Sequence, residues 1–383
     1  MSETIVALTG IECSVDSVRF RFTVDGPAER MFWDNRELVI YCSEGVTSDL
    51  IDLAGTFVIA MAPVSWLGVG QVVMEHEISV DVKTMLRRMG DFLAAHYGWE
   101  ARDASAGIRS TGFERFPAPH VGLMFSGGVD SSAALLELGG TIDWLIHLSN
   151  FENLDVQMTR RQRAVGPYTT RRVAHERGLG WIHLRTNIAA IFKHGRFDHA
   201  FPEGCSFWLG LEHVHHIVTA LSALRLNLGR VYLAGGLNEL TTAVGSVAAN
   251  ADFIAGYDAP VPLTMVDELV TRQDKVERLL DLGPELLRTL RVCYSSGDST
   301  CASCLKCRAT AMMILSAGGR LAETSFPADI HGAIDEVIAE LSKIGPEGHT
   351  LFNQSLDGRC LSGSRAERWS QLSALVQADR MDV

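Results

Sequence analysis

From residue 120 onward the chain alternates short apolar runs with segments of helical periodicity, and this alternation constrains the fold more than any other feature. The apolar runs are HVGLMF, DWLIHLS, WIHLR and RVYLAGG. Helical spacing of apolar residues follows the first three runs, in SSAALLEL, in Thr170–Arg177 and in Phe207–Leu228. Strands that alternate with helices in this way form a parallel sheet covered on both faces. The sequence therefore predicts an α/β fold.

A glycine-rich loop directly follows the first apolar run and opens the first helix. Two adjacent glycines let a backbone turn tightly and approach an anion closely, and a helix start offers free N–H groups and the positive end of its dipole. Asp130 offers a carboxylate that can help hold Mg²⁺ against phosphate oxygens. The pattern predicts a phosphate site, although a plain strand–turn–helix with a serine cap also fits it. The loop residues are Ser126, Gly127, Gly128, Val129, Asp130, Ser131 and Ser132.

The loop is neither a Walker A loop, since it has no GKS or GKT, nor a GxGxxG dinucleotide fingerprint. The string SGGVDSS resembles the PP-loop of the ATP pyrophosphatase superfamily. This resemblance implies a Rossmann-like fold of the adenine nucleotide alpha hydrolase type, in which residues 126–132 bind ATP with Mg²⁺. It also implies that the substrate attacks the α-phosphate, giving an adenylated intermediate and pyrophosphate. Asp130 and Ser131 then become catalytic candidates.

Four of the eight cysteines fall in one short segment with the spacing C-x7-C-x2-C-x2-C. Short CxxC spacings let successive thiolates converge on a tetrahedral Zn²⁺, and four thiolates leave no open coordination position. We therefore expect a structural zinc site, with an iron–sulfur cluster or four reduced, metal-free cysteines as the alternatives. The expected ligands are Cys293, Cys301, Cys304 and Cys307.

The order of these motifs resembles that of the 7-cyano-7-deazaguanine synthases over roughly residues 120–318. Those enzymes combine a PP-loop, a lysine-bearing helix and a four-cysteine zinc site. The resemblance implies that Lys275 reaches the nucleotide or the reacting oxygen, although a surface lysine on a helix fits as well. Asn238 and Glu239 follow a strand at the end where parallel sheets bind ligands, so they are substrate-site candidates beside the alternative of ordinary turn residues.

One departure from the synthase pattern affects the expected substrate. Residues 240–253, LTTAVGSVAANADF, are smaller and less polar than the aromatic stretch that the synthases carry there. The resemblance therefore implies a ligase that adenylates a carboxylate or carbonyl oxygen, on a 7-deazaguanine, a related acid or a protein-linked carboxylate. An ammonia donor then supplies the nitrogen of an amide or nitrile. Residue 2 is Ser and the chain starts with no nucleophilic cysteine, so we expect ammonia from solution or from a partner.

Two other functions stay open. A tRNA or nucleobase sulfurtransferase would need a reactive cysteine, and Cys205 lies at a possible helix start where a thiolate is stabilised. A lone cysteine is more often a small buried apolar residue. A zinc scaffold that binds ATP without turnover is the other alternative. His213, His215 and His216 suggest a metal site at first glance, but packing explains them better because His215 points away from the face that the other two share.

Residues 1–115 are predicted to form a β-rich accessory domain with a linking helix. Alternating polar and apolar residues between positions 14 and 42 predict strands. The uncharged segment Leu53–Met74 is interrupted by Pro and Gly, which favours two buried strands, Thr56–Pro63 and Gly70–Met74, over a membrane span. Helical spacing follows at Val80–Tyr97. The ATP pyrophosphatase domain is expected at 116–325 and a helical extension at 326–383, with helices at 327–344 and 364–378.

Composition limits the partners. The chain of 383 residues has 34 Lys and Arg against 46 Asp and Glu, a net charge of -12. Duplex-binding proteins usually carry a basic excess, because phosphate contacts supply most of their affinity. We therefore expect no bulk nucleic-acid binding. The first ten residues lack the charged start and apolar core of a secretory signal, so we expect a cytoplasmic protein without a membrane contact. A homodimer and a protein partner bound through residues 1–115 are further expectations.

Overall fold

A computed structural model describes residues 3–112, 118–149, 160–226, 228–235, 246–247, 250–293, 301–327, 329–344, 352 and 354–381. Nine strands form one mixed sheet, and a short pair, β5 (Ile78–Ser79) and β6 (Ser110–Thr111), lies outside it. The order across the large sheet is β11-β10-β7-β8-β9-β3-β2-β1-β4. These strands are β1 (Thr4–Cys13), β2 (Ser17–Asp25), β3 (Glu37–Cys42), β4 (Gly70–Val73), β7 (His120–Met124), β8 (Trp144–Ser149), β9 (Gly180–Thr186), β10 (Leu228–Ala234) and β11 (Leu263–Val266).

The second half of the sheet is parallel, as the alternation of strands and helices predicts. β7 pairs with β8 on one side and with β10 on the other, β9 follows β8, and β11 follows β10. In chain order this gives the spatial order third, second, first, fourth, fifth. The winding direction thus reverses between β7 and β10. In open parallel sheets such a reversal leaves a crevice at the carboxyl ends of the two strands, because the connections leave them in opposite directions.

The N-terminal strands belong to the same sheet rather than to one of their own. β3 pairs antiparallel with β9, with Tyr41 opposite Arg185, and β2, β1 and β4 continue outward from it. Alternate residues of β2 and β3 are buried, which confirms the predicted strands between positions 14 and 42. A single apolar core includes Phe20 of β2 and Ile182 of β9. The division into domains at residue 115 stays a prediction, and the sheet runs across it.

One expectation in this region is wrong. Thr56–Pro63 is not a strand but the middle of a helix, α1 (Leu50–Trp66). Asp49 caps this helix by accepting hydrogen bonds from the N–H groups of Ile51 and Asp52. The helix is buried from Leu53 to Trp66, so its sequence is apolar on every side and lacks the 3.6-residue period by which an exposed helix is recognised. The strand predicted at Gly70–Met74 is confirmed as β4.

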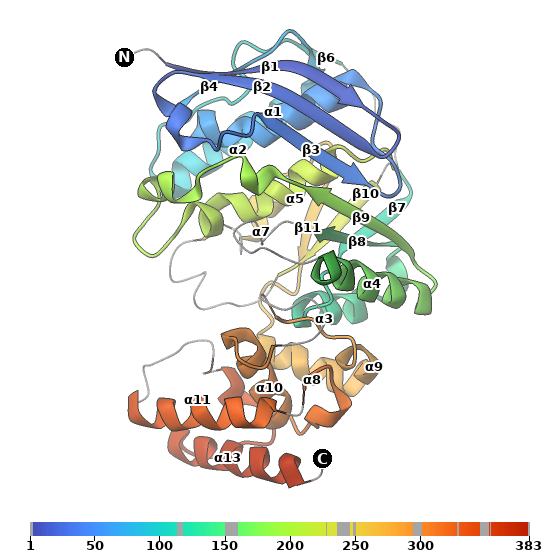
Figure 1. Ribbon diagram of the computed structural model, residues 1–383, viewed down its shortest axis with the longest axis vertical. Helices are drawn as coiled ribbons and strands as arrows, with labels where there is room; N and C mark the ends of the chain where they lie inside the picture. Colours follow the sequence, from blue (N-terminus) through green and yellow to red (C-terminus); the bar gives the residue numbers. More distant parts are fainter. Residues whose placement is uncertain are drawn as a thin grey trace.

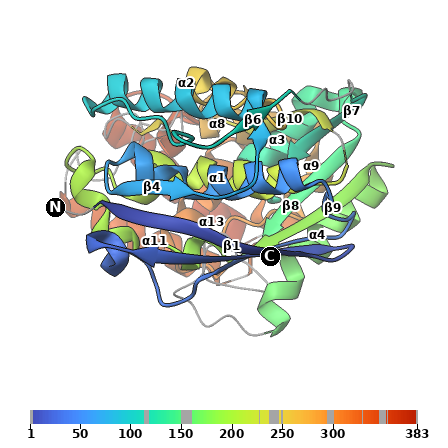
Figure 2. The ribbon, with the colours of Figure 1, turned by 90° about the horizontal axis from the view of Figure 1, so that it is seen from above.

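Helices cover the two faces of the sheet unequally (Figures 1 and 2). α1, α2 and α5 lie on one face, and Figure 2 shows α1 between the sheet and α2. α4 packs on β8 and β9, and α3 packs against α8. The bounds are α2 (Val80–Tyr97), α3 (Val129–Leu138), α4 (Arg160–Glu176), α5 (His213–Ser222), α7 (Ala251–Ala255), α8 (Arg272–Leu282) and α9 (Pro284–Leu287).

The C-terminal helices gather at the opposite end of the molecule from β1 and β2 (Figure 1). They confirm the helices predicted at 327–344 and 364–378, while the extension as a separate unit stays a prediction. These helices share a second apolar core with α3 and α8 that contains Val129, Leu279 and Met312. Within the described residues, no helix combines the length and apolarity that a membrane span needs. The bounds are α10 (Leu305–Ser316), α11 (Ile330–Ile344) and α13 (Arg365–Met381).

Candidate functional site

The glycine loop leaves the carboxyl end of β7, beside the reversal in strand order. Phe125 is buried and its N–H donates to the carbonyl oxygen of Ile146 at 2.8 Å, which holds the loop start against β8. Gly127 has φ +79°, a left-handed conformation that side-chain-bearing residues rarely adopt. Gly128 is the N-cap of α3 and Val129 is its first residue. The two glycines therefore let the chain turn directly from a strand into a helix start.

The loop serines bond to the loop itself. The Ser126 hydroxyl accepts the N–H of Gly128 at 3.3 Å and lies 3.3 Å from the Ser131 hydroxyl. Ser131 in turn donates to the carbonyl oxygen of Gly128, and Ser132 is buried beneath the loop. No side-chain hydrogen bond caps the N-terminus of α3. The loop therefore combines a preshaped backbone with a helix start whose N–H groups can face an anion.

Asp130 in the first turn of α3 meets two cations from α8. Its carboxylate lies 2.6 Å from Nη2 of Arg272 and 3.2 Å from Nζ of Lys275. Half-burial of Asp130 by itself favours the neutral acid, but the charges of Arg272 and Lys275 outweigh it and lower the pKa of Asp130 to about 2. Asp130 is therefore an anion at neutral pH.

Lys275 lies at the carboxyl end of β10, beside the reversal in strand order. Its side chain is 0% exposed, and Nζ also donates to the carbonyl oxygen of Gly235, the residue directly after β10. A capping box of Thr271 and Asp274 starts α8 and fixes the helix orientation. Of the two interpretations of Lys275, the surface lysine is wrong. The residue joins the ends of β7 and β10, where the strand order reverses.

Two cationic side chains beside the loop, Arg272 and Arg291, were not among the residues predicted from the sequence. Arg272 precedes Lys275 by three residues, so the two share a helix face, and this spacing is the signal that could have found it. Arg291 donates its backbone N–H to the carbonyl oxygen of Gly127 at 2.8 Å. A Cβ added to Gly166 of α4 would lie 2.0 Å from Nη1 of Arg291, so the guanidinium packs directly on that glycine. No pattern around Arg291 points to this position.

His147 of β8 lies under the same guanidinium. Its Nδ1 is 3.2 Å from the carbonyl oxygen of Phe125 and its ring is 5.8 Å from that of His183 on β9. Burial, followed by the charges of His183 and Arg291, lowers the pKa of His147 to about 3. The imidazole is therefore neutral at physiological pH, and it supports the loop rather than adding to its charge.

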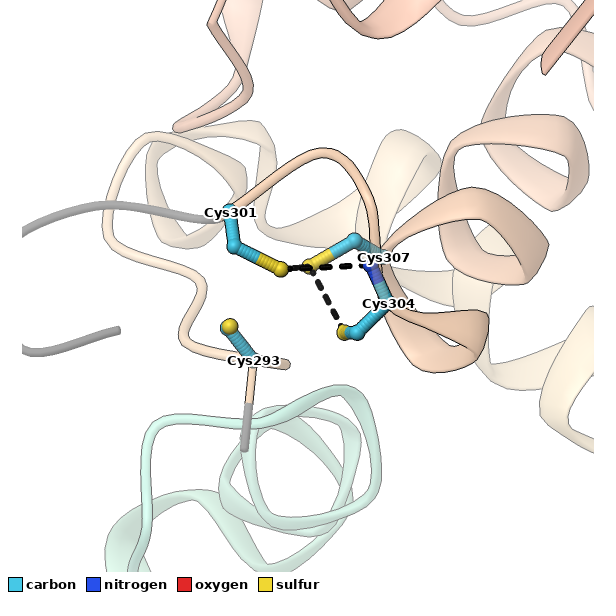
Figure 3. A group of neighbouring side chains, drawn as sticks. All are labelled: Cys293, Cys301, Cys304 and Cys307. Atoms are coloured by element: carbon cyan, nitrogen blue, oxygen red, sulfur yellow. Dashed lines mark hydrogen bonds between the residues drawn. The ribbon is translucent and has the colours of Figure 1, made fainter. Parts of the chain in front are cut away.

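The four predicted cysteine ligands come together near the start of α10 (Figure 3). Their sulfur atoms all lie within 4.8 Å of one another. The Cys304 and Cys307 sulfurs are 3.4 Å apart, and those of Cys301 and Cys307 are 3.9 Å apart. Zn–S bonds of about 2.3 Å in a tetrahedron place sulfurs ~3.8 Å apart. The cluster thus fits a metal ion such as zinc.

The electrostatics of this cluster also favour a cation. Burial raises the pKa of Cys304, and burial together with the adjacent thiols raises the pKa of Cys307. Four thiolates in one half-buried place repel one another, so a bound cation is what would let them all ionise. Backbone N–H of Cys304 donates to the Cys301 sulfur at 3.2 Å, a contact common around bound thiolates.

Of the remaining candidate residues, some lie outside the described part of the chain and others are buried in the core. Asn238 and Glu239 lie outside the described residues. Cys205 is buried, and burial raises the pKa of its thiol, so its surroundings do not favour a reactive thiolate. The Glu212 carboxylate accepts a hydrogen bond from Nε2 of His216 at 2.6 Å, and its other oxygen lies 2.8 Å from Nε2 of His194. This buried group belongs to the core around α5.

No protein-family model and no curated protein matches the sequence of this chain. The fold and the site therefore define the class of this protein. It is an α/β protein with a glycine loop at the strand-order reversal and a four-cysteine cluster able to hold a metal.

Proposed function

We propose that the protein is an ATP-dependent ligase of the ATP pyrophosphatase type, which adenylates a carboxylate or carbonyl oxygen. The observation that carries the proposal is the meeting of Asp130, Arg272 and Lys275 at the glycine loop. The loop lies at the reversal in strand order, which is the place where open parallel sheets bind ligands. The strand order of the parallel half supports a Rossmann-like fold of the adenine nucleotide alpha hydrolase type.

The charges around the loop suit a polyphosphate. Arg272, Lys275 and Arg291 supply three cations near the loop, while the protein as a whole has a net charge of -12. A bound triphosphate can replace Asp130 as the partner of Arg272 and Lys275, which leaves the Asp130 carboxylate available to a cation. Mg²⁺ that accompanies ATP would neutralise phosphate charge, and Asp130 would hold it. The main contribution of the protein is then positioning and electrostatic stabilisation.

The proposed reaction has two stages. An oxygen of the acceptor forms a bond to the α-phosphorus, the bond to the bridging oxygen breaks, and pyrophosphate leaves with the electron pair. Ammonia then attacks the activated carbon, AMP leaves, and the surplus proton passes to solvent. This gives an amide. The amide oxygen can then attack the α-phosphorus of a second ATP, which releases pyrophosphate, and loss of AMP and of both N–H protons to solvent gives a nitrile. The acceptor is a small acid, such as a 7-deazaguanine acid, or a protein-linked carboxylate.

The sulfurtransferase alternative receives less support, because the buried Cys205 thiol has a raised pKa. Binding of ATP without turnover stays the second alternative. A cytoplasmic location, a homodimer and a partner bound through residues 1–115 stay predictions.

The test is turnover of Mg·ATP with ammonia, with and without a pool of carboxylic acids that includes 7-carboxy-7-deazaguanine. AMP and pyrophosphate are measured for the wild type, for Asp130→Ala and for the control Asp25→Ala at the exposed end of β2. We expect acceptor-dependent AMP that disappears only in Asp130→Ala. ADP and phosphate would refute attack on the α-phosphate. ATP binding without any product across the acceptor pool would favour the binding-only protein.

A further inference from the structure

We propose that metal binding at the four cysteines sets the nucleotide affinity of the glycine loop, through the short segment from Thr289 to Cys293 and through α10. The inference rests on the proposed function in one respect only, that the ligand of the loop is ATP. It assigns to the metal a role beyond holding the C-terminal helices together.

The first connection runs through the backbone next to the loop. Arg291 donates its N–H to Gly127 at 2.8 Å, and a Cβ on Gly128 would lie 3.5 Å from the carbonyl oxygen of Arg291. The carbonyl oxygen of Thr289 lies 3.9 Å from the corresponding position on Gly127. The segment therefore lies against both glycines, and the Arg291 N–H bonds to the residue in the left-handed conformation.

The same segment ends at a metal ligand. Cys293 follows Arg291 by two residues, and two residues span at most about 7 Å. The other three ligands come from Cys301 to Cys307, beyond residues 294–300, which the structure does not describe. A metal ion therefore joins the loop-facing segment to α10. Without the ion there are no metal–thiolate bonds, so Cys293 loses its link to the ligands at α10.

The second connection leads from α10 to Lys275. Cys307 lies in the first turn of α10, and the carbonyl oxygen of Met313 in the same helix accepts the side-chain amide of Gln273 at 3.2 Å. The Ser316 hydroxyl lies 3.3 Å from the other end of that amide. Gln273 precedes Lys275 by two residues on α8. The helix that carries Cys307 thus also holds the helix that carries Lys275.

Both connections meet at one place. Gly127 and Lys275 belong to the proposed phosphate site. Gly127 is one backbone hydrogen bond and two residues away from Cys293. Lys275 is two residues away from Gln273, whose side chain bonds to α10. Loss of the metal is therefore expected to loosen the glycine loop and the start of α8 together. A metal that merely fastens α10 to α11 and α13 would leave both unchanged.

The test compares hydrogen–deuterium exchange of the full-length zinc-loaded protein with that of protein stripped by a chelator, and then of stripped protein reloaded with zinc. We expect exchange of amides 126–132 and 272–276 to rise on the order of tenfold after stripping and to recover on reloading. ATP affinity, measured by calorimetry, is expected to fall by a similar factor. Cys301→Ser should reproduce the stripped state, and Cys360→Ser, an exposed cysteine outside the cluster, should not.

Unchanged exchange at 126–132 in stripped protein whose 301–307 peptides exchange faster would overturn the proposal. So would a loosened loop with unchanged ATP affinity. If Cys301→Ser does not fold, the stripped and reloaded wild type gives the same comparison. A zinc-loaded protein that binds no ATP would refute the proposed function, while the exchange measurement would still decide whether metal and loop are coupled.

Discussion

The ammonium group of Lys275, fully buried, lies 3.2 Å from the carboxylate of Asp130 although 145 residues separate them in the chain. Asp130 lies in the first turn of the helix after β7, and Lys275 reaches the end of β10 through the carbonyl oxygen of Gly235. The pair therefore spans the point where the strand order reverses. Because Lys275 is fully buried and Asp130 is half-buried, the two opposite charges stabilise each other away from water.

Removing the charge of Lys275 is expected to lower the rate of catalysis strongly and to affect folding less. Lys275→Met should lower the rate of AMP formation by about 100-fold or more, since a preorganised cation in a desolvated site contributes on that scale. Lys193→Met is the matched control, because Lys193 packs over the ring of Trp33 away from the loop. Pyrophosphate release and the melting temperature are measured together. Equal activities in the two variants would contradict a role for Lys275 at the phosphates.

Neutralising Asp130 is expected to destabilise the protein in a pH-dependent way. The pKa of Asp130 is about 2, below its ordinary 3.8, so the folded state favours the carboxylate. Its stabilisation is therefore complete above about pH 4 and disappears as pH falls through 2. At pH 7, Asp130→Asn leaves Lys275 buried beside a neutral group and should cost about 3–5 kcal/mol of unfolding free energy.

Urea unfolding at several pH values measures this difference, with the exposed Asp25→Asn as the control. The cost of Asp130→Asn should shrink towards pH 2. A cost that stays constant from pH 7 to pH 2.5 would mean that the carboxylate charge is not what stabilises this region.

His147 should lower the free energy of unfolding in acid, and its effect should begin at a higher pH than that of Asp130. Its pKa is lowered to about 3 from 6.5, chiefly by burial, so between these values the unfolded chain binds a proton that the folded chain does not. Stability therefore falls as pH decreases, by about 1.4 kcal/mol per pH unit from this residue. His147→Gln can still donate to the Phe125 carbonyl oxygen. Between pH 6 and pH 4.5 this variant should lose about 2 kcal/mol less unfolding free energy than the wild type, measured by urea unfolding. His120→Gln, at the first residue of β7, should lose as much as the wild type.

The eight cysteines should react in three groups. Cys13 and Cys360 are exposed, Cys42 and Cys205 are buried, and the remaining four form the cluster. A thiol reagent is therefore expected to modify two cysteines rapidly in the native metal-loaded protein and four more after chelation. Metal analysis should find about one zinc per chain, since four thiolates complete a tetrahedral site. Iron in place of zinc, or six rapid thiols before chelation, would contradict this assignment.

Local patterns predicted most elements well, because each half-exposed strand or helix carries its own period. The parallel strands from β7 to β10, the helix at Val80–Tyr97 and the C-terminal helices are all present. The failure at Thr56–Pro63 has a physical cause. α1 is packed on all sides, and a fully buried helix has no polar face to mark its period.

The sequence by itself determined the local chemistry of the site. Adjacent glycines before a helix favour a tight loop, and two residues between neighbours bring together the sulfurs of Cys301, Cys304 and Cys307. Neither result needs distant parts of the chain. Arg272, Lys275 and Arg291 are different, since their meeting with the loop depends on which strands pair and on where α8 packs. Long-range packing of two apolar cores decided that arrangement, and no local period in the sequence encodes it.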